Sequence, residues 1–209
     1  MKARNVLLGA ALVITTAAIT TQVVSQDKGK DKGAPPQMTP EQQAMMKKWM
    51  DFSTPNENHK LLASKEGKWA DTVKMWEQPG QEPDITSGTS EFKMIMDGRY
   101  LSDTTEGSFM GNPFHGHGLT GYDNLKKKFF SIWIDNMGTG VMIAEGSYDA
   151  GAKAFKYTTE SPDVMTGKYV AARSVEKMID NDHWTMEMYQ NDKTGKEYKS
   201  MEINYTRLK

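Results

Sequence analysis

The alternation of apolar and polar residues from Gly67 to the C-terminus constrains the fold of this chain more than any other feature. Residues two apart project from the same face of a β-strand, so a period of two gives each strand one apolar face and one polar face. The sets that share a face are Phe92/Met94/Met96, Trp184/Met186/Met188 and Met201/Ile203/Tyr205. The pattern therefore predicts a mainly β protein.

Turn signals such as Asp97-Gly98, Asp123-Asn124 and Asp180-Asn181-Asp182 divide this region into about ten segments of strand length. The predicted strands are 68–76, 86–96, 99–107, 114–123, 128–135, 140–148, 154–159, 169–180, 183–191 and 197–207. Short hairpins between successive strands favour a single antiparallel up-and-down β-barrel, which leaves no strand edge exposed. We assign residues 65–209 to this β-barrel domain.

The residues before the barrel divide into three segments. Residues 1–25 place Lys2 and Arg4 before an uncharged apolar run from Val6 to Ile19, the layout of a cleaved signal peptide, with an uncleaved anchor as the alternative. Residues 26–37 are polar and rich in Gly and Lys, and they read as a flexible linker. Residues 38–64 form a helical segment, with helix starts at Thr39-Pro40 and Thr54-Pro55. We expect a periplasmic or secreted protein.

Composition and missing motifs exclude several classes of function. The chain has no cysteine, which excludes disulfides, thiol catalysis and thiolate metal sites. Without residues 1–25 it carries 24 basic and 27 acidic residues, a net charge of -3 with no basic block, so we expect neither nucleic acid nor, after signal cleavage, a membrane as partner. No phosphate loop, nucleophile elbow or triad spacing is present, and no motif indicates a cofactor. A small molecule remains the expected partner.

Two sets of residues carry a family resemblance. Gly67-Lys68-Trp69 opens the first predicted strand and resembles the Gly-x-Trp start of lipocalin-like (calycin) barrels, in which the tryptophan packs near an arginine; Arg207 is the matching residue here. The central block resembles the bacterial family called domain of unknown function 1579 through Gly98-Arg99-Tyr100-Leu101, Phe114-x-Gly116-x-Gly118, Gly121-Tyr122-Asp123-Asn124, Trp133-x-Asp135, Gly146-x-Tyr148-Asp149 and Met201-Glu202-Ile203-x-Tyr205-Thr206-Arg207. The resemblance implies a barrel and export, and it implies no catalytic roles. It makes Gly67, Trp69 and Arg207 structural, with Arg207 closing on Trp69 by a cation–π contact.

Two histidines are the weak metal candidates of the chain. His115 and His117 lie two apart on a predicted strand, so both project from one face and could bind one ion if a third ligand joined them. Phe114 and Tyr122 occupy the opposite face and are the better core candidates. We therefore expect the histidines outside the barrel or at its rim. An enzymatic alternative, a hydrolase or isomerase, would use His115, His117 and Asp135.

The candidate ligand-binding residues are Arg99, Tyr122, Trp133 and Arg173. An arginine inside a barrel could bind a carboxylate through two hydrogen bonds, and Arg173 falls on the face of Val175, so an inward and a structural position both stay open. Glycines 116, 118 and 121 either allow the strand to coil, which we favour, or leave room for a ligand. We predict a barrel that binds a small, largely apolar molecule, with a structural or interaction module with a filled barrel as a further alternative.

Overall fold

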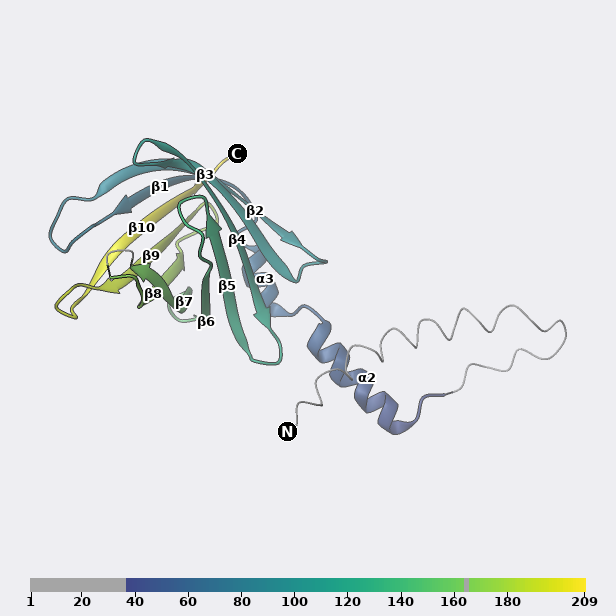
Figure 1. Ribbon diagram of the computed structural model, residues 1–209. Coiled ribbons are helices and arrows are strands. Elements are labelled where there is room, and N and C mark those ends of the chain that lie inside the picture. The colour runs from purple at the N-terminus through teal and green to yellow at the C-terminus, as the bar shows by residue number, and fades with distance from the viewer. Residues whose placement is uncertain (1–36, 164–165) are drawn as a thin grey trace. The chain divides into compact units, whose positions relative to one another are not determined.

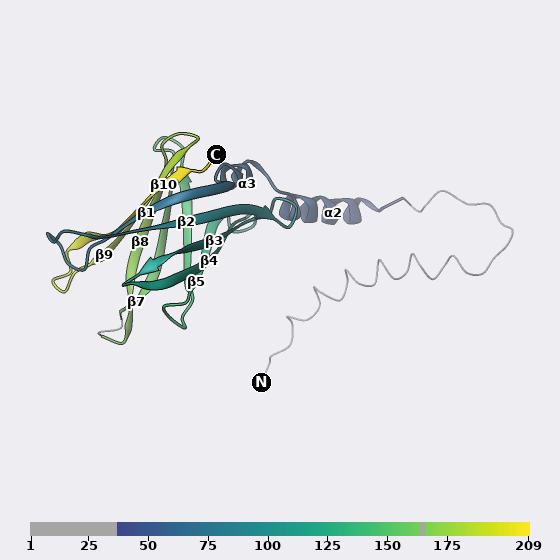
Figure 2. The same cartoon turned by 90° about the horizontal axis from the view of Figure 1, so that it is seen from above.

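The computed structural model describes residues 37–163 and 166–209, and the predicted signal peptide lies outside these residues. Ten antiparallel strands pair in sequence order, and the first strand also pairs with the last, so the sheet closes into a barrel (Figures 1 and 2). The strands are β1 Gly67–Met75, β2 Asp84–Ile95, β3 Tyr100–Phe109, β4 Asn112–Asp123, β5 Lys128–Asp135, β6 Met142–Asp149, β7 Ala154–Asp163, β8 Lys168–Met178, β9 His183–Asn191 and β10 Glu197–Arg207. The predicted fold class is confirmed.

The observed strand boundaries follow the predicted ones closely, and β5, β9 and β10 agree at both ends. One expectation about side-chain direction was wrong. Met96 does not share the inner face with Phe92 and Met94, because β2 ends at Ile95 and Met96 begins the turn to β3 with a φ of 52°. Its side chain is 67% exposed, whereas Met94 packs against the core.

Two helices precede the barrel. Helix α2 (Pro40–Ser53) begins where the sequence predicted, and Thr39 and Gln42 exchange hydrogen bonds between side chain and backbone at its N-terminus. Helix α3 (Glu57–Ala63) begins later than predicted, because its N-cap is Asn56 and not Thr54. The side chain of His59 in turn accepts from the Asn56 backbone, so the two residues cap α3 reciprocally. Among the described residues, no helix is both long and apolar enough to span a membrane.

Aromatic rings fill the end of the barrel next to α3, which packs on β2, β3 and β4. Trp184 stacks on Tyr205 with ring centroids 3.7 Å apart and meets Trp69 and Phe92 edge-on. The rings prefer these offset and edge-to-face arrangements, so contact geometry adds to the burial of apolar area. The buried members of this aromatic core are Leu62, Trp69, Phe92, Leu101, Phe129, Ala144, Phe155, Tyr157, Trp184 and Tyr205.

Arg207 closes the same end from outside. Its guanidinium lies 4.0 Å from the Trp69 ring centroid and donates to the backbone carbonyls of Ser64, Glu66 and Asn181. Gly67 adopts a φ of 124°, and a Cβ there would lie 2.6 Å from Arg207 Nη1. The packing of Arg207 on Trp69 expected from the sequence is therefore present, and Gly67 provides the room for it.

Replacing Arg207 by alanine is expected to lower the free energy of unfolding by about 1–3 kcal/mol, because a cation–π contact and three charge-assisted hydrogen bonds are lost. Denaturant unfolding measures the change. Arg207→Lys is the control: it keeps the charge but not the planar fork, so it should recover only part of the loss. Full stability of Arg207→Ala would contradict a closing role for this residue.

Candidate functional site: a cavity above an acidic floor

A cavity of about 430 Å³ occupies the half of the barrel farthest from the aromatic core. Its walls are mainly apolar and come from inward-facing side chains of β1, β9 and β10, namely Val73, Met75, Met186, Met188, Met201 and Ile203, together with Phe114 on β4 and Trp133 on β5. The alternation in the sequence predicted an inner face for Met186, Met188, Met201 and Ile203, and it made Phe114 a core candidate. Small-molecule sites in proteins have this size and this apolar character.

Asp71 lies between the cavity and the aromatic core. It lines the cavity, is only 3% exposed, and accepts a hydrogen bond of 2.5 Å from Ser90 Oγ at Oδ2. Ser90 Oγ lies 2.8 Å from the hydroxyl of Thr105. Asp71 Oδ1 has no hydrogen-bond partner in the part of the chain that the structure describes. A buried carboxylate oxygen without a donor is costly, so a ligand with a hydrogen-bond donor would be stabilised at this atom.

Asp103 on β3 is a second buried carboxyl of this layer, with 8% exposure. Its pKa is raised to about 7, mainly by burial and also by the negative charges of Glu176 and Asp71, while Lys65 acts in the opposite direction. Burial likewise raises the pKa of Asp71 to about 6, against the hydrogen bond from Ser90. Both carboxyls therefore exchange protons near neutral pH, which exposed aspartates do not.

Lys65 supplies positive charge to the barrel interior from the segment between α3 and β1. Its side chain is 3% exposed and forms an ion pair with Glu176 on β8. The ammonium also lies 4.6 Å from the ring centroid of Phe155 and 4.5 Å from that of Trp184. Glu176 already neutralises Lys65, and within the described part of the chain no ion pair joins Asp71 or Asp103 to a cation.

The strand glycines of β4 make room for protein side chains. A Cβ at Gly116 would lie 2.2 Å from the Trp133 ring, and a Cβ at Gly118 would lie 2.2 Å from Asp103 Oδ1. Protein side chains therefore occupy the space that the sequence left open for a ligand, and the favoured role of these glycines in strand coiling stays a prediction. The glycines let Trp133, which lines the cavity, and the buried Asp103 approach the backbone of β4 closely.

Of the four candidate ligand-binding residues, Trp133 lines the cavity. Its indole Nε1 donates to Asp135, which also lines the cavity. Tyr122 faces inward at the aromatic end, where it contacts Phe129 at 4.8 Å between ring centroids. Arg99 lies in the turn between β2 and β3 and donates to the carbonyl of Ser53.

Arg173 lies on the outer face of β8, which corrects the inward position considered from the sequence. The alternation of β8 buries Ala172 and turns Arg173 outward, where it forms a bidentate ion pair with Glu197. The guanidinium also covers the ring of Tyr189 at 3.8 Å. No arginine therefore reaches the cavity from β8.

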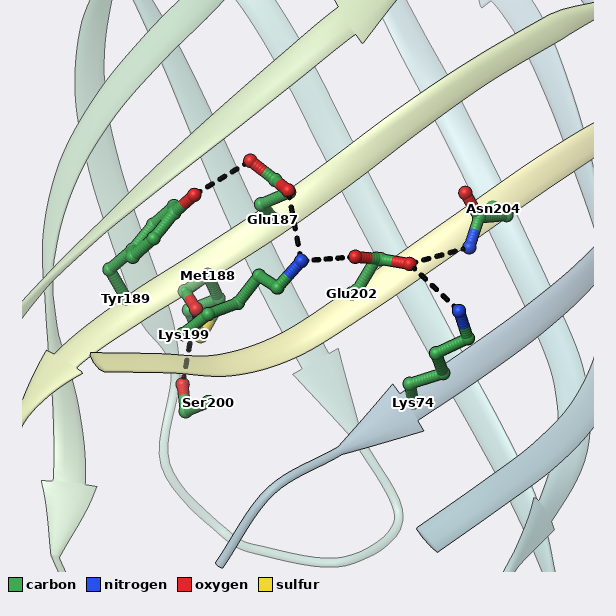
Figure 3. A network of polar contacts seen from close by, with 8 residues as sticks. All are labelled: Lys74, Glu187, Met188, Tyr189, Lys199, Ser200, Glu202 and Asn204. Atoms are coloured by element: carbon green, nitrogen blue, oxygen red, sulfur yellow. Dashed lines mark hydrogen bonds and ion pairs between the residues drawn. The ribbon is translucent and has the colours of Figure 1, made fainter. Parts of the chain in front are cut away.

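A network of polar side chains covers the outer faces of β1, β9 and β10, as Figure 3 shows. Lys199 binds Glu187 and Glu202, and Glu202 also accepts from Lys74 and Asn204. The Lys199 hydrogen bond is the main reason that the pKa of Glu202 falls to about 2. The same strands turn methionines inward. Their outer faces therefore carry paired charges in contact with water, and their inner faces are apolar.

The histidines lie outside, as expected. His115 and His117 are both exposed on the outer face of β4, and His115 Nδ1 lies 2.5 Å from Glu106. Asp135 pairs with Gly116 across β4 and β5 and therefore faces inward, which separates it from both histidines. The structure thus corrects the idea of a joint site at His115, His117 and Asp135. Among the described residues, no three His, Cys, Asp or Glu side chains are grouped to hold a metal ion.

Comparison with known proteins places this architecture in a family. The family model described as "Protein of unknown function (DUF1579)" matches residues 54–207, which span α3 and the whole barrel. The chain belongs to this family. The resemblance found in the sequence is thereby confirmed.

A solved structure shares the fold of this DUF1579 protein. Rv2717c from M. tuberculosis is 14% identical, with a TM-score of 0.55, over 75% of this chain and 100% of that chain. At this identity the likeness shows the barrel fold alone. A redesigned β-barrel also matches at 10% identity and a TM-score of 0.37, over 71% of this chain and 96% of that chain. No curated protein matches the chain.

Proposed function

We propose that this DUF1579 protein binds a small, largely apolar molecule inside its barrel. The observation that carries the proposal is the cavity of about 430 Å³ with methionine, isoleucine and valine walls. Methionine side chains adapt to ligands of different shape, and burial of apolar area supplies the binding free energy. The cavity counts against a filled barrel. The separation of Asp135 from the histidines leaves the enzymatic alternative without a supporting geometry.

Export belongs to the same proposal. It is supported by the order of Lys2, Arg4 and the apolar run Val6 to Ile19, which is typical of a signal peptide. The mass of the protein isolated from its host would test the removal of residues 1–25.

Filling the cavity is expected to weaken binding. Decanol, a neutral apolar probe, should bind the protein with 1:1 stoichiometry in calorimetric titration, and Met188→Trp should weaken binding by about tenfold or more, because the indole occupies the cavity. The control is Thr185→Trp, which adds the same ring to the outer face of β9. Binding of decanol that survives in Met188→Trp would place the site outside the cavity and overturn the proposal.

A further inference from the structure

We propose that the cavity selects apolar molecules that carry one cationic amine, with Asp71 as the group that receives the ammonium. This inference rests on the proposed function, because it assigns the polar end of the ligand that the cavity binds. The apolar walls would hold the hydrocarbon part, and the floor would hold the charge.

The charges that line the cavity all have one sign. Among the described residues, the charged residues of the lining are Asp71, Glu106 and Asp135, of which Glu106 turns its side chain to the outer face, and no lysine, arginine or histidine joins them. An anionic ligand such as a fatty acid would therefore meet repulsion. A cation would meet attraction that a low-dielectric interior strengthens.

The hydrogen bonds of these acids select Asp71. Asp135 already accepts from Trp133 Nε1 and from the backbone of Met137. Glu106 pairs with His115 on the outer face. Among the carboxyl oxygens of the lining, Asp71 Oδ1 is the one that is buried without a hydrogen-bond partner in the described part of the chain. An ammonium donates up to three hydrogen bonds and would satisfy this oxygen.

The described surroundings of Asp71 supply acceptors and negative charge, and the one cation near it, Lys65, is already paired. Ser90 on β2 and Thr105 on β3 offer hydroxyl oxygens beside it. The titratable and charged groups near this floor are Asp103 on β3, Tyr157 on β7, Glu176 on β8, Tyr205 on β10 and Lys65, of which Lys65 is committed to Glu176. A bound ammonium would provide the counter-charge that the two aspartates lack.

A neutral polar ligand would use the same floor differently. An alcohol could donate one hydrogen bond to Asp71, yet it brings no charge, so Asp71 and Asp103 would remain protonated in part. Amine binding should instead favour the ionised carboxyl and release a proton near pH 6. This difference separates the two chemistries in one experiment.

The test is calorimetric titration of the protein with decylamine, decanol and decanoate, which share one hydrocarbon chain and differ in the head group. At pH 8, where decylamine is a cation, it should bind about tenfold or more tightly than decanol, and decanoate should bind weakest. Asp71→Asn keeps an acceptor for Ser90 and should reduce the preference for the amine to about threefold or less. Asp97→Asn removes an exposed carboxylate, with 99% side-chain exposure, and should change nothing.

A second measurement does not depend on the folding of a variant. Titrations at pH 6 in two buffers of different ionisation enthalpy should show proton release on binding decylamine and none on binding decanol. Equal affinity for decylamine and decanol, or an amine preference that Asp71→Asn keeps, would overturn this inference while leaving the proposed function standing. Failure of all three probes to bind would overturn the proposed function instead.

Discussion

Replacement of Lys65 by methionine is expected to lower the free energy of unfolding by about 3–5 kcal/mol, because it leaves Glu176 as an unpaired charge in the barrel interior. The ion pair is well shielded, with side-chain exposures of 3% for Lys65 and 19% for Glu176. The ammonium also contacts the rings of Phe155 and Trp184, so those contacts are lost as well. Denaturant unfolding at neutral pH measures the effect.

A second replacement identifies the cause. Lys65→Met combined with Glu176→Met removes both charges and should return the free energy of unfolding to within about 1 kcal/mol of the unmodified protein. The control is Lys68→Met, whose ion pair with Glu91 is exposed and 3.9 Å long; it should cost less than about 0.5 kcal/mol. If the double variant is as unstable as Lys65→Met, the loss comes from packing and not from the stranded charge.

Asp103 should make the protein less stable as the pH rises. Its pKa lies at about 7 in the folded protein, mainly because of burial, against an ordinary value of 3.8. Between these values the folded state holds a proton that the unfolded state has released, so the free energy of unfolding falls as the pH increases. At about 1.4 kcal/mol for each pKa unit, the loss by pH 8 is of the order of 4 kcal/mol, and Asp71 adds to it.

Asp103→Asn should remove most of this dependence. The amide resembles the protonated acid in shape, so the variant should gain about 2–4 kcal/mol at pH 8 and change by less than about 0.5 kcal/mol at pH 4.5. Urea unfolding at several pH values gives both curves, and Asp97→Asn serves as the exposed control. Parallel curves for Asp103→Asn and the unmodified protein would show that this carboxyl ionises normally in the fold.

The barrel was predictable from the sequence because its strands and turns are marked by residues that are close together in the chain. Alternation with period two marks inner and outer faces, and Asx and glycine turns mark where each strand ends, so β9 and β10 were placed at their observed ends. Met96 was misplaced for a local reason too. The hairpin between β2 and β3 is longer than the pair Asp97-Gly98, and its first residue leaves the strand.

The candidate site was less predictable because it depends on pairs that are distant in sequence. The sequence directed attention to Arg99 and Arg173. The buried acids are instead Asp71, which lines the cavity, and Asp103, which lies near Asp71 outside the lining, and no motif marked either. One signal existed: a carboxylate within the apolar set Trp69, Asp71, Val73 places a charge on the inner face of β1. The partner of Lys65 could not be found in this way, because Glu176 lies more than a hundred residues later.

The pairing of β1 with β10 also governs when this chain can finish folding. Trp69 lies opposite Arg207, so contacts between the first and last strands join nearly the two ends of the barrel sequence. Until β10 is available, β1 and β9 each present an unpaired edge, which is the surface through which β-proteins aggregate. Such long-range closure also slows folding. A newly made chain therefore forms a closed barrel only after the last eleven residues of the barrel, Glu197–Arg207, have paired with β1 and β9.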